Sequence, residues 1–495
     1  MSLRRRTLVT SGAAAIAGPL LPRTSWADVA SRTVGNNNEV TITSADIATL
    51  KSKMRGAVLQ AGDAPYEEVR KNWAGSFDRH PSLILSCKGA DDVITAVNFL
   101  RNHNLLTAIR AGGHSYSGQS SVERGVMIDL QPMKQLSVDP KARTARAAAG
   151  VFLGEFDRAC QAHGLATTAG VVPHTGVAGL TLGGGVGRLM RMYGMTIDNV
   201  LSMDIVTADG RFLRANKDEN PDLFWASLGG AGNFGIVTSF DYQLHKVGPN
   251  CNTFAYRFPD DQVRTVMKHY FEYSENAPDN LHTIGIISCG ADGKLSAVIS
   301  ATHFGDASEA EKLAAPLAKF GKPTGGDIRT RTYVDVQQGG PNPSPHGRGN
   351  YTTGGYMNNR PEIIDPICDR YAASPFAGSS VSFFGLGGQT NRRPNDATAY
   401  AHRGALCQVS VGGAWHDPLG KGKEYGDKLI AWSRETWRGL EKYMDGGYYA
   451  NQTTDQTEQN IRENYRDNYD RLVAMKTKYD PTNFFRLNAN IRPKA

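Results

Sequence analysis

A histidine in a loop of glycines and hydroxyl residues is the first place in this sequence that could carry chemistry. Residues 109–121 read IRAGGHSYSGQSS and put His114 directly after Gly112 and Gly113. Glycines let a ligand approach the backbone closely. An imidazole in such a loop can act as a nucleophile toward that ligand.

Two further glycine-rich loops follow within about 125 residues. Residues 176–187 read GVAGLTLGGGVG, and residues 229–235 read GGAGNFG. Backbone N–H groups in loops of this kind form concave sites for anions such as a pyrophosphate. Three such loops suit a long, extended dinucleotide better than a single phosphate.

Residues 230–235 also match the pattern G-x-G-x-x-G, which is found in classical dinucleotide-binding folds. That fingerprint needs a helix directly after the glycines. Here the chain continues as GIVTSFDYQL, which is typical of a strand. The sequence therefore argues against that classical fold.

The sequence on both sides of these loops predicts the strands and helices that position them. Residues 81–126 predict a strand, a helix and a second strand, and Ala208-Asp209-Gly210 predicts a hairpin between two strands. From about Val247 the pattern changes to strands and helices typical of an antiparallel sheet covered on one face. Helices are expected near residues 423–443 and as one segment over 460–480, ended by Pro481.

Composition limits the function classes. The formal charge is +7, and four arginines in the first 27 residues account for more than half of it. The sequence has no basic stripe of the kind that nucleic-acid binding needs. Its six cysteines have no metal-like spacing, so no metal site is predicted, and their pairing in disulfides stays open.

The first 27 residues predict an export signal. They have a basic start, a short apolar run and a small-x-small site at Ser25-Trp26-Ala27. Residues 5–9, RRTLV, fit the twin-arginine pattern, whose machinery exports folded proteins. A periplasmic or secreted protein is expected, with no stable membrane insertion because no apolar stretch reaches the roughly 20 residues that a spanning helix needs.

Four motifs together resemble a known family. They are RAGGHSYSG, AGVVPHTGVAGLTLGGGVGRLMRMYGMTIDNV, GGAGNFGIVT and YDPTNFFRLNANIRP, in this order between residues 81 and 493. They resemble the berberine-bridge-enzyme-like branch of the vanillyl-alcohol-oxidase flavoproteins. The resemblance implies an α+β, two-domain FAD-binding fold. Its FAD-binding domain would span residues 66–246, its antiparallel-sheet substrate domain residues 247–440, and its C-terminal segment, residues 441–495, would return to the FAD domain.

In that family the histidine of the first motif is bonded to the flavin, which implies that His114 carries FAD covalently. Doubly linked relatives have a cysteine where this chain has Val172, so a single bond is expected. Arg110 and the amides of residues 111–115 become candidates for the pyrophosphate. The flavin-binding residues implied by the resemblance are Arg110, Ala111, Gly112, Gly113, His114, Ser115, Val172, His174, Thr175, Gly176, Val177, Gly179, Leu180, Gly183, Gly184, Gly187, Asn233, Gly235, Ile236, Val237, Asn488 and Asn490.

The resemblance indicates the catalytic residues less clearly than the flavin-binding residues. Val186 replaces the tyrosine that serves many relatives as general base, so that role cannot be transferred. Tyr449, Gln408 and Asn451 are the candidates, because they resemble the polar residues that face the flavin ring. Val177 stands at the family's oxygen-gate position, where a valine is associated with oxygen access, and a mere packing role is the alternative.

The expected function is that of an FAD-dependent oxidoreductase that takes a hydride from a C–H next to oxygen or nitrogen of a small molecule, with O₂ as acceptor. Amines fit the candidate residues better than simple alcohols, and the single link argues against an oligosaccharide. Two alternatives stay open: a dehydrogenase that reduces a quinone or cytochrome, and a flavin-binding protein without turnover. The sequence does not indicate an oligomeric state.

Overall fold

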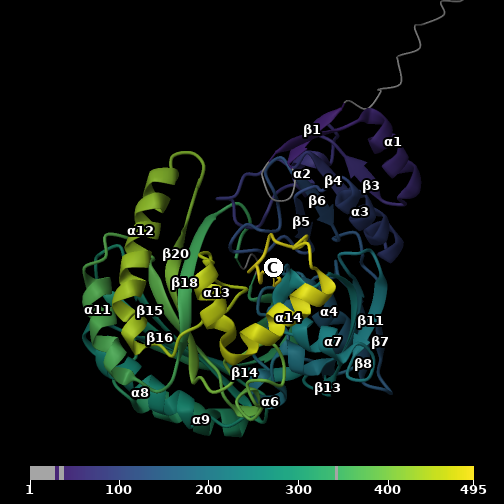
Figure 1. Ribbon diagram of the computed structural model, residues 1–495. Coiled ribbons are helices and arrows are strands. Elements are labelled where there is room, and N and C mark those ends of the chain that lie inside the picture. Colours follow the sequence, from purple (N-terminus) through teal and green to yellow (C-terminus); the bar gives the residue numbers. More distant parts are fainter. Residues whose placement is uncertain (1–27, 33–37, 341–343, 495) are drawn as a thin grey trace, which may run out of the picture.

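The computed structural model describes residues 28–32, 38–340 and 344–494. Figure 1 shows an N-terminal half, drawn in purple to teal, beside a second half, drawn in green. The C-terminal segment, in yellow, lies between them with α13 (Glu458–Tyr465) and α14 (Tyr469–Tyr479). The chain thus returns from the second half to the N-terminal half.

The N-terminal half begins with two small sheets. Strands β1 (Val29–Arg32) and β2 (Glu39–Ile42) pair with each other, and four strands form the order β3-β4-β6-β5 in the described chain. These are β3 (Ala57–Leu59), β4 (Leu83–Ser86), β5 (Thr107–Arg110) and β6 (Val126–Asp129), accompanied by helices α1 (Ser44–Lys53), α2 (Tyr66–Val69) and α3 (Ala90–Asn102).

The strand, helix and strand expected over residues 81–126 are present as β4, α3 and β5. Both strands run parallel to β6, and all four residues of β4 are buried, as its apolar run indicated. The sheet nevertheless starts before residue 66, the predicted start of the FAD domain, because β3 pairs with β4. A strand of three residues is too short to show an alternating pattern.

A five-stranded antiparallel sheet completes this half, in the order β11-β10-β12-β8-β7 among the residues described. The predicted hairpin is confirmed as β10 and β11, and Gly210 supplies the left-handed backbone (φ 82°) of its turn. The strands are β7 (Leu136–Asp139), β8 (Thr144–Ala148), β10 (Val200–Val206), β11 (Phe212–Asn216) and β12 (Ile236–Gln243). The remaining elements are α4 (Leu153–Gln161), α5 (Val177–Leu182), α6 (Met190–Tyr193), α7 (Pro221–Ser227) and the paired strands β9 (Leu165–Ala166) and β13 (His245–Lys246).

The second half is an antiparallel sheet with the order β17-β14-β16-β15-β19-β20-β18, as the sequence predicted. Its strands are β14 (Asn250–Phe258), β15 (Leu281–Cys289), β16 (Leu295–His303), β17 (Gly325–Thr332), β18 (Gly349–Met357), β19 (Ser380–Gly385) and β20 (Cys407–Trp415). Its helices are α8 (Val263–Glu275), α9 (Ala307–Lys319), α10 (Tyr333–Gln338), α11 (Ile364–Ala372) and α12 (Lys423–Leu440). In Figure 1 α8, α11 and α12 lie on the outer side of this sheet, which leaves its other face toward the N-terminal half.

The tail differs from the sequence prediction of one helix over residues 460–480. The chain breaks between α13 and α14 at Arg466, whose φ of 47° lies in the left-handed region that no α-helix interior adopts. The Arg466 guanidinium donates a hydrogen bond of 2.5 Å to the backbone oxygen of Asp445, which holds the break in place. The periodicity of both helices continues across this position, so the sequence pattern alone does not reveal it.

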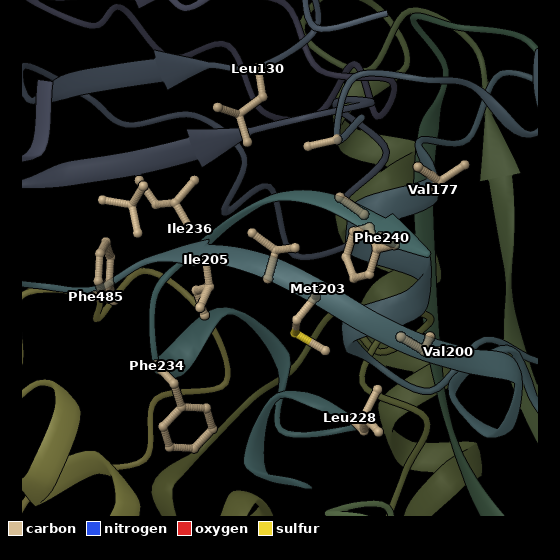
Figure 2. Packing of buried hydrophobic residues seen from close by; sticks show 14 of the residues in the cluster. Leu130, Val177, Val200, Met203, Ile205, Leu228, Phe234, Ile236, Phe240 and Phe485 are labelled. Atoms are coloured by element: carbon tan, nitrogen blue, oxygen red, sulfur yellow. The ribbon is translucent and has the colours of Figure 1, made fainter. Parts of the chain in front are cut away.

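Each half has its own apolar core. Figure 2 shows part of the first, a cluster that contains Ile205, Ile236 and Phe240 of the five-stranded sheet together with Phe485 of the tail. The second core joins the seven-stranded sheet to its covering helices. All six cysteines are buried and unpaired, which settles the open question of disulfides. None of the helices in the described residues is long and apolar enough to cross a membrane.

Candidate active site

One large cavity lies where the predicted site residues converge. Its lining comes mainly from two stretches of the chain, which we call the glycine wall, meaning the lining residues between positions 111 and 237, and the C-terminal wall, meaning those between positions 449 and 489. The three glycine-rich loops all contribute to the glycine wall. Of the predicted residues, those that line the cavity are Ala111, Gly112, Gly113, His114, Ser115, Val172, Thr175, Gly176, Gly179, Leu180, Gly235, Ile236, Val237, Tyr449, Asn451 and Asn488.

Trp73 and the backbone hold His114 in place. The imidazole stacks on the Trp73 indole with ring centroids 4.3 Å apart, and Gly113 turns the chain with a φ of 67°. The His114 Nε2 atom is buried and has no hydrogen-bond partner. Burial, with His174 and His346 nearby, lowers the pKa of His114 to about 3, so the ring is neutral and keeps a nitrogen lone pair at neutral pH.

His174 and His346 continue from His114 as a row of imidazoles. The His174 ring centroid lies 4.9 Å from that of His114 and 4.6 Å from that of His346. His174 is not among the residues that line the cavity, so it lies behind His114 rather than against a ligand. His346 comes from the second half, whose backbone at Gly347 donates to the Trp73 carbonyl (3.0 Å). The second half therefore helps to fix the His114 loop.

Arg110, which was predicted to bind the pyrophosphate, is not among the residues that line the cavity, and its Nε atom is buried without a hydrogen-bond partner. Its guanidinium is buried under the loop, where it pairs with Asp129 (2.9 Å) and donates to the side chain of Gln131 (2.8 Å). Because these acceptors hold it away from the cavity, Arg110 supports the loop instead. The described lining contains no arginine or lysine, so backbone N–H groups, hydroxyls and amides are the available donors for an anion.

The glycines of the second cluster, residues 176–187, have two kinds of surroundings. A side chain on Gly179 would meet nothing within 4 Å, so this residue leaves the cavity open, whereas one on Gly183 would collide with the Asn451 amide. Gly184 and Gly187 likewise make room for neighbouring protein groups rather than for a ligand. These three glycines were predicted to contact the cofactor, and none of them is among the residues that line the cavity, although Val186 between them is.

Val177 also lies outside the cavity. It begins α5, is buried, and belongs to the apolar core drawn in Figure 2. This position agrees with the packing role that the sequence left open, and the described lining does not include its side chain. The part of α5 that reaches the cavity is formed by Ala178, Gly179 and Leu180.

Tyr449 and Asn451 form a connected pair in the C-terminal wall. The Tyr449 hydroxyl oxygen accepts hydrogen bonds from the backbone amides of Gly185 (3.2 Å) and Val186 (3.1 Å) and from the Asn451 amide (3.0 Å). Burial raises the pKa of Tyr449, and these donors offset part of the effect. The phenol is therefore protonated at neutral pH and is well placed as a hydrogen-bond group.

Gln408, the third predicted catalytic residue, lies behind the cavity wall. Its Nε2 donates to the Oε1 of Gln452 (2.6 Å), and Gln452 lines the cavity. Gln408 faces Phe384 across paired strands β20 and β19, and Phe384 is the residue of the seven-stranded sheet that reaches the lining. Gln408 thus contacts the cavity lining through Gln452, which the sequence analysis missed because the contact depends on a partner that only the folded chain brings next to it.

The tail is anchored by a buried ion pair. Lys476 and Asp480 are fully buried and 2.7 Å apart, and Lys476 also donates to the carbonyls of Asn233 and Phe485, both at 2.8 Å. Asn233 does not line the cavity but bonds the backbone of Ala489 (3.0 Å). Asn233 was predicted to contact the flavin, but in the structure it supports the tail and does not line the cavity. Asn490 does not line the cavity either.

The polar groups at the cavity surface suit a flavin dinucleotide. Besides His114 Nε2, the buried oxygens Asn488 Oδ1 and Gln456 Oε1 lack partners at its surface, so a ligand with hydrogen-bond donors would satisfy them. Side chains on Gly179 and Gly232 would point into open space. The described residues hold no group of three or more metal-ligating side chains. Fold and site together define a flavin-dependent oxidoreductase.

Comparison with known proteins gives the same class. Residues 81–216 match the family described as FAD binding domain, and residues 449–492 the family described as berberine and berberine-like. An FAD-linked oxidoreductase of Dictyostelium discoideum is 31% identical over 446 residues, 89% of this chain and 95% of the relative. (R)-6-hydroxynicotine oxidase of Paenarthrobacter nicotinovorans is 28% identical over 456 residues, which are 89% of this chain and 97% of the relative.

Solved structures agree. That of 6-hydroxy-D-nicotine oxidase from Arthrobacter nicotinovorans superimposes with a TM-score of 0.82 at 26% identity, covering 89% of this chain and 98% of the other. A variant of berberine bridge enzyme, at 20% identity, shares the fold with a TM-score of 0.80. The chain belongs to the berberine-bridge-enzyme-like FAD-linked oxidoreductases of the vanillyl-alcohol-oxidase superfamily. It is an enzyme, its cofactor is FAD, and the resemblance seen in the four motifs is confirmed.

Proposed function

We propose that the protein is an oxidase whose FAD is bonded covalently to His114 and whose electron acceptor is O₂. The observation that carries the covalent link is the His114 Nε2 atom: it is buried in the cavity lining, unpartnered, and neutral. A neutral imidazole has the lone pair that a nucleophile needs. Val172 lines the same cavity without a thiol, which supports a single link.

The covalent link is tested by acid precipitation of the purified protein, followed by mass analysis of the peptide that contains residues 110–118. We expect the yellow colour to stay in the pellet and the mass of FAD to lie on His114. The His114→Ala variant should release its flavin. Colour that moves to the supernatant of the native protein would refute the link but not the family.

FAD held in this cavity would supply the redox chemistry, as the acceptor of a hydride from a C–H next to oxygen or nitrogen of a small molecule. The protein orients the substrate, and Tyr449, Asn451 and Gln452 offer it uncharged hydrogen-bond groups. Tyr449→Phe removes the hydroxyl and leaves its three N–H donors unpaired. We expect a loss of about 10²–10⁴-fold in kcat/KM if the phenol exchanges a proton with the substrate. An unchanged rate would exclude that role.

The acceptor is tested separately. Flavin reduced under nitrogen should be reoxidised rapidly when air is admitted, with release of H₂O₂. Slow reoxidation in air together with fast reoxidation by a quinone would instead identify a dehydrogenase.

We also propose that residues 1–27, which lie outside the described residues, direct export through the twin-arginine pathway. The sequence of their basic start and cleavage site supports this. Replacing Arg5 and Arg6 by lysine should keep the protein in the cytoplasm of a host that has the pathway. Export unchanged by that replacement would contradict the proposal.

A further inference from the structure

Arg188 is a charged residue close to the flavin cavity that the proposed reaction does not use. It follows Val186, which lines the cavity, by two positions, and α6 begins two positions after it. Its Nη1 atom donates to the side-chain oxygen of Gln337 (2.8 Å), which belongs to α10 of the second half. Arg188 is thus held where the glycine wall meets the second half of the molecule.

The bond to Gln337 leaves one edge of the Arg188 guanidinium free. In the described part of the chain, neither its Nε nor its Nη2 has a hydrogen-bond partner, and the residue is partly exposed. These two atoms form an edge that can donate two parallel hydrogen bonds to one carboxylate. Arg191, three positions later, differs because its three side-chain nitrogens all donate to backbone carbonyls. Arg191 therefore supports the fold, whereas Arg188 keeps donors for a ligand.

The charge of Arg188 is not balanced by an acidic partner. Within the residues that the structure describes, it forms no ion pair with an aspartate or a glutamate. Asp157 is the acid whose charge acts on it, but this carboxylate accepts from Gln337 instead (3.3 Å), and burial raises the pKa of Asp157 to about 7. Burial also lowers the pKa of Arg188 from 12.5, yet a guanidinium stays protonated at neutral pH. The positive charge therefore remains available to an anion.

The face of the seven-stranded sheet beside Arg188 carries neutral side chains. Phe384 of this face lines the flavin cavity, and the His282 ring lies against it with ring centroids 4.5 Å apart. Burial, together with the nearby charge of Arg188, lowers the pKa of His282 to about 3, so this imidazole is neutral. Ser382 and Ser410 follow on the same face as partners on β19 and β20, and both are partly exposed. A molecule between the flavin and this face would find Arg188 among neutral neighbours.

From this arrangement we infer that Arg188 binds a carboxylate of the substrate, so that the enzyme oxidises a small molecule with an anionic end. The inference rests on the proposed function because it concerns the substrate of that oxidase. Arg188 does not line the flavin cavity in the described structure, so the carboxylate lies away from the reacting carbon. Two parallel, charge-assisted hydrogen bonds fix the orientation of a carboxylate. An anchor at one end of the substrate holds its C–H in one orientation toward the flavin.

Three carboxylates of increasing length test the inference: benzoate, phenylacetate and 3-phenylpropionate, each compared with its neutral amide. Their affinities for the oxidised, flavin-loaded enzyme are measured from the change in the flavin absorbance band. We expect at least one carboxylate to bind about tenfold or more tightly than its amide, because charge-assisted hydrogen bonds are stronger than neutral ones. If none of the three carboxylates is preferred over its amide, the inference is overturned.

Variants of Arg188 locate this preference. Arg188→Gln should abolish it, whereas Arg188→Lys should keep part of it, because lysine retains the charge but not the two-bond edge. Arg438→Gln, at an exposed position of α12, is the matched control and should leave all affinities as in wild type. A preference that survives in Arg188→Gln would mean that another group binds the anion, and it would refute the inference.

The flavin content of each variant separates a substrate anchor from a cofactor ligand. Arg188→Gln should keep the wild-type ratio of flavin to protein, since Arg188 is not among the described residues that line the cavity. Loss of flavin from this variant would assign Arg188 to the cofactor or the fold and overturn the inference. The titrations use oxidised enzyme and need neither turnover nor O₂. A failure of the proposed oxidase activity would therefore show itself in the reoxidation experiment and leave the probe affinities interpretable.

Discussion

The two walls of the flavin cavity are built in different ways. The glycine wall is mostly backbone: Gly112 and Gly176 approach so closely that a side chain on either would collide with the other. The C-terminal wall consists of side chains, among them Tyr449 and Asn451, and is anchored by the buried Lys476–Asp480 pair. The first wall depends on the absence of side chains at its glycines, and the second depends on hydrogen bonds and an ion pair between side chains. We therefore expect substitutions in the glycine wall to act through steric overlap, and substitutions in the C-terminal wall to act through lost hydrogen bonds and unpaired charges.

Lys476→Met should have the largest effect, because it removes one partner of a fully buried ion pair. Asp480 keeps the backbone amides of Phe484 (2.7 Å) and Phe485 (2.9 Å) but loses its cation. A buried charge left without its partner destabilises a protein by about 3–5 kcal/mol. We expect a loss of that size in the free energy of unfolding, measured by chemical denaturation, together with weaker retention of the tail.

A double variant sharpens this test. Adding Asp480→Asn to Lys476→Met removes the unpaired charge and should recover part of the lost stability. If the double variant is as unstable as the sum of the two single variants, the pair is not coupled and the C-terminal wall is held by apolar packing alone.

The glycine wall is tested by a matched pair, Gly112→Ala and Gly179→Ala. A methyl group on Gly112 would press on the backbone of Gly176, and overpacking of this kind costs about 1–3 kcal/mol of stability. A methyl group on Gly179 meets nothing within 4 Å, so unfolding should change little while flavin binding weakens. Denaturation curves and the ratio of flavin to protein measure the two effects. Equal loss of stability in both variants would contradict the assignment of Gly179 to the open cavity.

The same contrast explains what could be predicted from the sequence. Gly112, Gly176 and Gly179 belong to motifs, since a backbone approach restricts which residue can stand at a position. The strands and the antiparallel second half were also predicted, because their apolar patterns are long enough to read. Gln452 and Lys476 were not found, because their roles depend on partners that only the folded chain brings together.

Arg110 shows what a motif alone cannot predict. It stands in the first motif and its charge suits a phosphate, yet it pairs with Asp129, nineteen positions further along the chain. The parallel register of β5 and β6 puts these two residues opposite each other. A sequence motif thus predicts that a residue lies near the site, whereas the register of the strands determines whether its side chain faces the cavity or another strand.

A buried histidine behind the C-terminal wall gives the smallest predicted effect. His402 bonds the backbone of Asn464 at 2.8 Å, and burial lowers its pKa from 6.5 to about 3. Between these pH values the unfolded chain binds a proton that the folded protein does not, so this group's contribution to stability is complete above pH 6.5 and declines as the pH falls. One such group changes the free energy of unfolding by up to about 1.4 kcal/mol per pH unit.

His402→Gln should therefore flatten the loss of stability between pH 6 and pH 5 by about 1 kcal/mol, measured by denaturant unfolding at each pH. A glutamine can still donate to the Asn464 carbonyl, which limits other changes. His163→Gln, at an exposed position at the end of α4, is the control and should leave the slope as in wild type. If His402→Gln keeps the wild-type slope, His402 takes up its proton in the folded protein, and the region behind the C-terminal wall is open to water rather than sealed by its side chains.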